Sequence, residues 1–167
     1  TRLVGSEMCI RDSLDKVLLR NVRATLYVDN EPVREEFGEI GFSDRGIEGA
    51  VALRMSRDAV DALIEEKRVK LVLDLKPALT EEVLHERIAR EIAELQSNEF
   101  FGELLRKLVP KPLVMPLAQE VDIRANCYVG KITEEQITRL VRTLKGLTFP
   151  ITDYAPFEYL SLIHISE

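Results

Sequence analysis

The chain has 167 residues, of which 46% are hydrophobic, and its formal net charge is −6. This length suits one compact domain or two small ones. The acidic balance argues against a general nucleic-acid-binding surface, because phosphate binding is driven by clustered Lys and Arg side chains. No apolar run approaches the roughly 20 residues needed to span a bilayer, so no membrane partner is expected. With few cysteines and no visible signal peptide, a cytoplasmic location is the expectation.

The two ends of the chain differ in character from the segment between them. With allowed codons, the DNA for residues 160–167 is the reverse complement of DNA that encodes residues 6–12. Two ends of one protein have no physical reason to be related in this way, whereas an adapter ligated to both ends of a DNA fragment gives this relation. Residues 1–13 and 160–167 are therefore predicted to be translated adapter, and they are excluded from the fold prediction as a tag would be. The alternative is a native hydrophobic C-terminus.

Residues 14–77 are predicted to be mainly β-strand, as the first part of a small barrel. Apolar residues alternate with polar ones in residues 22–28 and again in residues 69–75, which places one face of each strand in a core. Residues 29–32 supply turn chemistry. Residues 33–40 are therefore expected to form a partner strand.

A short helix is expected between these strands. Ser56 is a favourable N-cap residue, and Val60, Leu63 and Ile64 would form the core stripe of a helix that begins there.

Residues 78–146 are predicted to form an all-helical subdomain, because the hydrophobic period changes from two to about 3.6. Helices are expected after Thr80, around residues 99–109, near residues 113–121 and after Thr133, where a capping box precedes the last one. Gly146 is placed to end that helix. The predicted core-facing residues are Leu84, Ile88, Ile92, Leu95, Phe101, Leu104, Leu105, Leu108, Ile137, Leu140, Val141 and Leu144.

Residues 147–159 are predicted to return to the barrel as one more strand. This strand can find hydrogen-bond partners only among the earlier strands, since the segment between them is helical. The predicted fold class is therefore α+β, a small β-barrel with an inserted all-helical subdomain.

Few residues are candidates for acid–base or metal chemistry. Excluding the ends leaves His85 and Cys127, which cannot form a disulfide framework or a Cys/His metal site. His85 is interpreted as a helix-surface residue, since a catalytic histidine needs a cleft and an orienting partner. Cys127 has no activating neighbour and is interpreted as a buried small hydrophobic residue. The sequence predicts no catalytic residue and no metal ligand.

The glycine-rich segment of residues 38–50, GEIGFSDRGIEGA, is the most distinctive stretch. It lacks both the G-x-G-x-x-G spacing and the G-K-[ST] ending of phosphate-binding loops. Turns and bulges in a small barrel would explain it. The alternative is a loop whose backbone approaches a ligand or a neighbouring domain closely, which glycine permits.

Several runs along the chain resemble one bacterial flavoprotein family and keep its order over residues 14–159. The runs are RNVR (20–23), EFGE (36–39), FSDRGIEG (42–49), LRMSR (53–57), LDLKP (73–77), LLRKLVP (104–110), FPIT (149–152) and PFE (156–158). The family is that of the NAD(P)/FAD-dependent oxidoreductases often labelled aminoacetone oxidase family FAD-binding enzymes.

The resemblance implies that the chain is the insert domain of a FAD-dependent oxidoreductase, folded as a translation-factor-like β-barrel with a helical subdomain. FAD, with NAD(P)H as a candidate second cofactor, would be bound by the parent protein. The partner of this domain would be the FAD-binding domain of the same parent chain, and the fragment would not be an active enzyme alone. The residues implied to lie nearest the flavin or substrate are Asp44, Gly46, Ile47, Gly49, Thr152, Pro156 and Phe157.

The sequence departs from the family pattern at the glycine-rich loop. The family usually reads Phe-Thr-His or Phe-Thr-Asp there, whereas this chain reads FSD at residues 42–44. A histidine-based role is therefore unsupported. The alternative function is a free-standing barrel and helical module that binds a protein or nucleic-acid partner, although the acidic charge weakens the nucleic-acid version.

Overall fold

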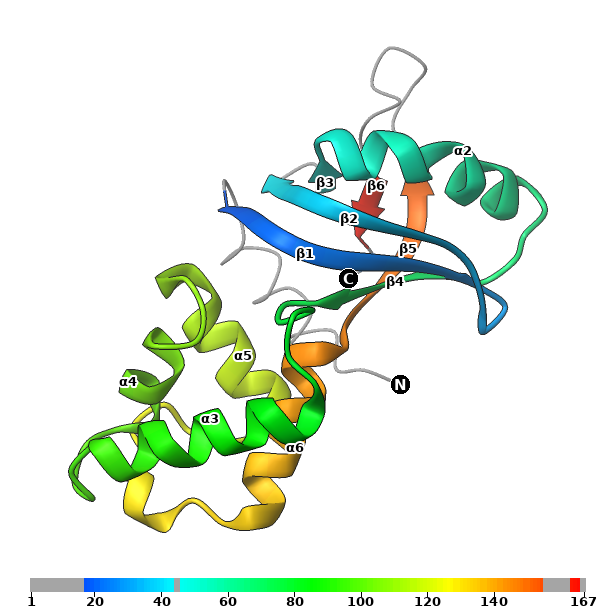
Figure 1. Cartoon of the computed structure of the whole chain (residues 1–167). Coiled ribbons are helices and arrows are strands. Elements are labelled where there is room, and N and C mark those ends of the chain that lie inside the picture. The colour runs from blue at the N-terminus through cyan, green and yellow to red at the C-terminus, as the bar shows by residue number, and fades with distance from the viewer. Residues whose placement is uncertain (1–16, 44–45, 155–162, 166–167) are drawn as a thin grey trace.

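The computed structural model describes residues 17–43, 46–154 and 163–165. It is a mixed α+β fold in which a β-barrel adjoins a separate helical lobe (Figure 1), so the predicted fold class is confirmed. The strands are β1 (Val17–Val28), β2 (Glu31–Ser43), β3 (Gly46–Glu48), β4 (Val69–Asp74), β5 (Leu147–Tyr154) and β6 (Ile163–Ile165). The helices are α2 (Ala50–Ile64), α3 (Glu81–Glu94), α4 (Phe101–Arg106), α5 (Val114–Val121) and α6 (Glu134–Lys145), with short 3-10 turns at Lys111–Leu113 and Val129–Lys131.

The barrel is closed, with its strands in the order β1-β2-β3-β6-β5-β4. Every neighbouring pair is antiparallel, and β1 pairs with both β2 and β4. The link between β3 and β5 is β6, so β1 to β5 by themselves make the five-stranded run β3-β2-β1-β4-β5. β6 lies within residues 160–167, the segment predicted to be translated adapter. If that prediction is right, the strand that closes the barrel is not part of the native protein. The adapter origin stays a prediction.

The alternation read from the sequence marks the barrel core. Val22, Ala24 and Leu26 of β1 are buried, and so are Val69, Leu71 and Leu73 of β4. The two sets lie opposite each other, since Ala24 pairs with Leu73 and Leu26 with Leu71. The period-two pattern therefore predicted the inward faces of both strands correctly.

Helix α2 corrects the short helix expected after Ser56. The helix already begins at Ala50, and the side chain of Ser56 lies inside it and donates a hydrogen bond to the Leu53 carbonyl at 2.8 Å. Ile64, expected in the core, is 64% exposed. The buried side chains are instead Val51, Ala52, Met55, Ser56, Ala59 and Ala62. A face built largely from small residues lets the helix lie close to the sheet, and it gives too weak a hydrophobic pattern to be read from the sequence.

The helical lobe matches the predicted pattern closely. The Thr80 hydroxyl accepts a hydrogen bond from the Val83 amide at 3.2 Å, and Thr133 and Gln136 form the predicted capping box. Helix α4 is shorter than the expected residues 99–109, although Phe101, Leu104, Leu105 and Leu108 are all buried as predicted. Stripe residues Ile92 and Leu95 are only partly buried, at the end of α3 where it leaves the core.

The lobe is inserted between two residues that pair with each other. Leu73 of β4 pairs with Leu147 of β5, and the whole lobe lies between them in the sequence. The two connections run side by side, because the Leu75 amide donates to the Leu144 carbonyl at 2.8 Å (Figure 1). The lobe therefore takes the place of the turn of a β-hairpin.

One lysine fastens these connections to each other. The Lys145 ammonium at the end of α6 donates to the Asp74 carboxylate and to the Lys76 carbonyl, both at 2.9 Å, and also to the Leu79 carbonyl. Lys145 and Asp74 are only 17% and 14% exposed, so the pair lies in a largely covered position. This contact joins the end of α6 to the end of β4 and to the connection between β4 and α3.

Candidate functional site

Glycines shape the backbone where most of the described candidate residues lie. Gly46 and Gly49 have φ values of 130° and 106°, which side-chain-bearing residues rarely adopt. Gly49 is the residue before α2, and its carbonyl accepts a hydrogen bond from Leu53 at 2.9 Å. A Cβ atom at Gly49 would lie 3.8 Å from both the Glu39 carbonyl and the Gly41 amide. The glycines therefore serve a tight turn from strand to helix beside β2, as the first of the two interpretations of this segment proposed.

The candidate residues differ in how they are exposed. Ile47 is fully buried, so its side chain belongs to the barrel core, whereas Thr152 on β5 is exposed. Asp44, Pro156 and Phe157 lie outside the described residues. Any contact of Ile47 with a ligand outside this domain would have to come from its backbone.

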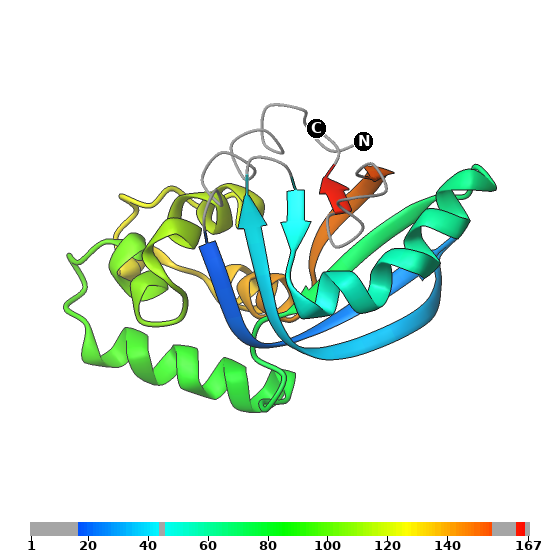
Figure 2. The same ribbon diagram turned by 90° about the horizontal axis from the view of Figure 1, so that it is seen from above.

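Strand pairing brings the glycine turn close to the end of β5. Val17 pairs with Phe42, Phe42 with Ile47, Ile47 with Ile163, and Ile163 with Tyr154. Figure 2 shows the start of β1, the end of β2, β3, β6 and the end of β5 following one another along one side of the barrel. Adjacent strands are about 4.8 Å apart, so this pairing row from Val17 to Tyr154 spans at most about 20 Å.

One of the described candidate residues, Thr152, lines a groove. The groove has a volume of about 510 Å³ and is also lined by Asn30, Lys67 and Lys70, next to the turn between β1 and β2. Gly46, Ile47 and Gly49 are not among its lining residues. This groove therefore does not bring Thr152 together with the glycine turn.

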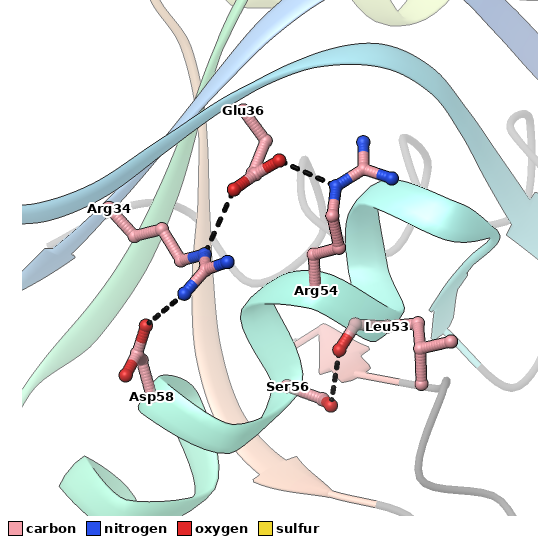
Figure 3. A network of polar contacts seen from close by, with 6 residues as sticks. All are labelled: Arg34, Glu36, Leu53, Arg54, Ser56 and Asp58. Carbon is pink, nitrogen blue, oxygen red and sulfur yellow. Dashed lines mark hydrogen bonds and ion pairs between the residues drawn. The ribbon is translucent and has the colours of Figure 1, made fainter.

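An ion-pair network holds α2 against the outer surface of β2. Figure 3 shows the Glu36 carboxylate accepting hydrogen bonds from the guanidinium groups of Arg34, at 3.0 Å, and Arg54. Arg34 also donates to Asp58 of α2 at 3.3 Å. The hydrogen bond from Arg54 lowers the pKa of the Glu36 carboxyl, and Arg34 adds to this against the opposing effect of burial. This network sets the position of the helix that follows the glycine turn.

Sequence reasoning missed a groove that lies between the barrel and the lobe. It has a volume of about 640 Å³ and brings together four cationic side chains from β1, the β4–α3 connection and α3. Its lining residues are Arg20, Asn21, Arg23, Phe37, Leu75, Lys76, Pro77, Ala78, Leu79 and Arg87. Three of the runs that carry the family resemblance, at residues 20–23, 36–39 and 73–77, contribute to it. Those runs were the available signal, but only the fold brings them together.

The two residues considered for acid–base chemistry, His85 and Cys127, both lie in the helical lobe. His85 Nε2 lies 3.0 Å from a Glu134 carboxylate oxygen, which links α3 to α6 at the lobe surface. Cys127 is half-buried, with its Sγ 3.6 Å from the Tyr128 carbonyl, so it is less covered than predicted. Among the described residues there is no group of three or more His, Cys, Asp or Glu side chains that could hold a metal ion. No helix in the same residues is both long and apolar enough to cross a membrane.

The fold is that of a barrel domain interrupted by a helical lobe, and two neighbouring connections, one leaving the barrel and one returning to it, join the two parts. Over residues 6–159 the chain matches the family described as HI0933-like protein barrel and H2TH domain. The chain belongs to this family, whose domain is the insert of HI0933/aminoacetone oxidase-like FAD flavoproteins. The resemblance found in the sequence is thereby confirmed. The comparison with curated proteins found no match.

Proposed function

We propose that this domain covers the flavin and shapes the substrate site of a FAD-dependent oxidoreductase, and that it is not active alone. Membership of the HI0933-like family supplies the flavoprotein context. The FAD-binding domain of the same parent chain would be its partner. The flavin would carry out the redox chemistry, as cofactors do, and this domain would contribute position and shelter from water.

Membership of a family whose domain is an insert in FAD flavoproteins is the observation that carries the proposal. The side of the barrel where the chain enters also carries the glycine turn. Val17 at the start of β1 pairs with Phe42 of β2, and Phe42 pairs with Ile47 of β3, so this placement needs no contact with residues 160–167. This side of the barrel is therefore the side that would face the flavin domain.

The groups available at this side of the barrel suit a domain that covers a cofactor and carries out no chemistry itself. Gly46 and Gly49 offer backbone without a side chain, which permits close approach of a planar ring. Thr152 offers an exposed hydroxyl that can donate or accept one hydrogen bond. Within the described residues neither group has an activating partner that would make it a general base or a nucleophile, which agrees with a role in excluding water and orienting a substrate.

The genomic DNA that surrounds this coding segment tests the proposal directly. Sequencing upstream of codon 14 and downstream of codon 159 should reveal a strand followed by G-x-G-x-x-G on the upstream side and a further FAD-binding segment downstream. A start codon close to codon 14 with no such fingerprint would overturn the proposal and favour the free-standing binding module.

A binding measurement tests the claim that the flavin site lies outside this chain. Riboflavin carries the flavin ring without any phosphate, and its fluorescence should stay unchanged when the chain is added at up to about 100 μM. Micromolar binding of riboflavin by the chain alone would show that the domain builds a flavin site by itself, against the proposal.

A further inference from the structure

The groove between the barrel and the lobe, called the basic groove below, is the feature that the proposed function does not use. It is defined by the lining residues already given, of which Arg20, Arg23, Lys76 and Arg87 are cationic. Its volume of about 640 Å³ falls within the range of small-molecule sites, roughly 300–1,000 Å³. The groove is formed by β1, β2, the β4–α3 connection and α3, so both the barrel and the lobe contribute to it.

A β-bulge directs two of the cations into this groove. The pairing of β1 with β2 shifts register between Leu19 and Val22, and Asn21 within the shift has a φ of 57°. Such an irregularity bends the strand and changes the direction of its side chains. Arg20 and Arg23, on either side of Asn21, both line the groove as a result.

Among the residues that the structure describes, not every cation of the groove is paired with an anion. Arg20 and Arg23 have partners in Glu39 and Glu35, each at 3.5 Å, but these pairs are exposed, and exposed pairs are weak. Asp74, beside Lys76 in the sequence, is bonded to Lys145 at 2.9 Å.

Lys76 and Arg87 are half-buried, and within residues 17–43, 46–154 and 163–165 neither side chain forms an ion pair. Burial, and then the nearby Arg87 cation, lower the pKa of the Lys76 amine. Two neighbouring cations without an anion raise the free energy of the folded state, and a bound anion would offset that cost.

We propose that the basic groove binds a nucleoside diphosphate, with the diphosphate between Lys76 and Arg87 and the base against the ring of Phe37. Guanidinium and ammonium groups together are the usual protein partners of phosphate oxygens. Phe37 also lines the groove and is 58% exposed, so a face of apolar aromatic surface is available beside the cations. This inference goes beyond the proposed function and does not depend on it.

Isothermal titration of the chain with ADP at low salt tests the proposal. ADP is expected to bind with a Kd below about 1 mM, and Lys76→Gln and Arg87→Gln are each expected to weaken binding at least about tenfold, which corresponds to about 1.4 kcal/mol. Arg90→Gln is the matched control, because Arg90 is exposed on the same helix and does not line the groove. It should leave the Kd unchanged within about twofold.

Three results would overturn the proposal. The first is that 5 mM ADP gives no heat of binding. The second is that Arg90→Gln weakens binding as much as Arg87→Gln does, and the third is that Lys76→Gln and Arg87→Gln both leave the affinity for ADP unchanged. Equal affinity for ADP and pyrophosphate, with no loss in Phe37→Ala, would overturn the assignment of a nucleotide and leave a site for a simple phosphate. Because Lys76 is half-buried, amide spectra of each variant must show the folded chain. On binding, the amides of Asn21 and Arg23 are expected to shift.

Discussion

The barrel and the helical lobe are built from opposite kinds of contact. The barrel pairs residues far apart in the sequence, such as Leu73 with Leu147, whereas the lobe is one contiguous segment in which α3 and α6 have their own side-chain caps. The lobe can therefore form most of its hydrogen bonds before the barrel is complete. The barrel needs the lobe to bring β5 back to β4, because closing a long loop costs entropy until the ends are held together.

Both regions have an apolar core, but the contacts chosen below for substitution differ between them. The lobe has an apolar centre that includes the fully buried Phe101, Leu104 and Leu105. The outer surface of the barrel instead carries charge, through the network of Arg34, Glu36, Arg54 and Asp58 that fastens α2. The comparison predicts that substitutions inside the lobe lower the free energy of unfolding most. Intermediate effects are expected at the contacts of Lys145 with Asp74, Lys76 and Leu79, called the hinge below. Small, pH-dependent effects are expected on the barrel surface.

The largest effect is expected from Phe101→Ala. Loss of a fully buried phenyl ring costs about 3–5 kcal/mol of unfolding free energy, because the transfer energy is lost and a cavity is left. The change should be measured by urea denaturation, with amide hydrogen exchange followed separately in the lobe and in β1 and β2. We expect the lobe amides to lose protection first.

The control for this substitution is Leu53→Ala, a residue that is 54% exposed and should change stability by less than about 0.5 kcal/mol. An equal loss of protection in the barrel and the lobe would contradict the difference drawn between them, since it would make them one cooperative unit.

An intermediate effect is expected at the hinge, from Lys145→Ala. This change leaves the Asp74 carboxylate and two carbonyls without their donor in a largely covered position. The expected loss is about 2–3 kcal/mol in urea denaturation, since charge-assisted hydrogen bonds are lost and a covered charge is left unpaired. It should also weaken ADP binding at the basic groove, because Lys145 bonds the carbonyls of Lys76 and Leu79, which line that groove.

Lys107→Ala is the matched comparison, since the Lys107 pair with Glu91 at 3.5 Å is more exposed and does not bridge the two regions. Its cost should stay below about 1 kcal/mol. Equal costs for the two lysines would remove the hinge role assigned to Lys145.

The smallest effect is expected on the barrel surface, from Glu36→Gln. At pH 7 the loss should be about 0.5–1 kcal/mol, because partly exposed ion pairs are weak even when two arginines share one carboxylate. The folded-state pKa of Glu36 is lowered, so its contribution is fully present above the unfolded-state pKa and is lost as the pH falls through the folded-state value. The difference between variant and parent should therefore shrink below about pH 4.5.

Thermal denaturation between pH 3 and pH 7 measures this, with Glu31→Gln, an exposed position at the start of the same strand, as the control. A difference that grows on acidification would have the wrong sign for a lowered pKa.

The predictions from sequence succeeded where the signal was local and periodic. Alternation in residues 22–28 and 69–75 identified the inward faces of β1 and β4, and the Thr80 cap, the capping box at Thr133 and the apolar stripes identified helices of the lobe. They failed at α2, where the buried face consists largely of small residues such as Ala52, Ala59 and Ala62 and the helix begins at a glycine turn. Small residues such as alanine can face either the core or the solvent. Which face of such a helix is buried therefore depends on its packing partner and cannot be predicted from the helix sequence alone.

The sequence by itself determined the fold class, the insertion of a helical segment between two strands, and the family. These depend on the order and period of residues along the chain. Tertiary structure alone decided which distant residues meet. It brought the glycine turn into one row with Val17 and Phe42, buried Ile47 in the core, and placed Arg20, Lys76 and Arg87 around one groove. The physical reason is that strand register and the Lys145 hinge set these distances, and both join residues that are remote in the sequence.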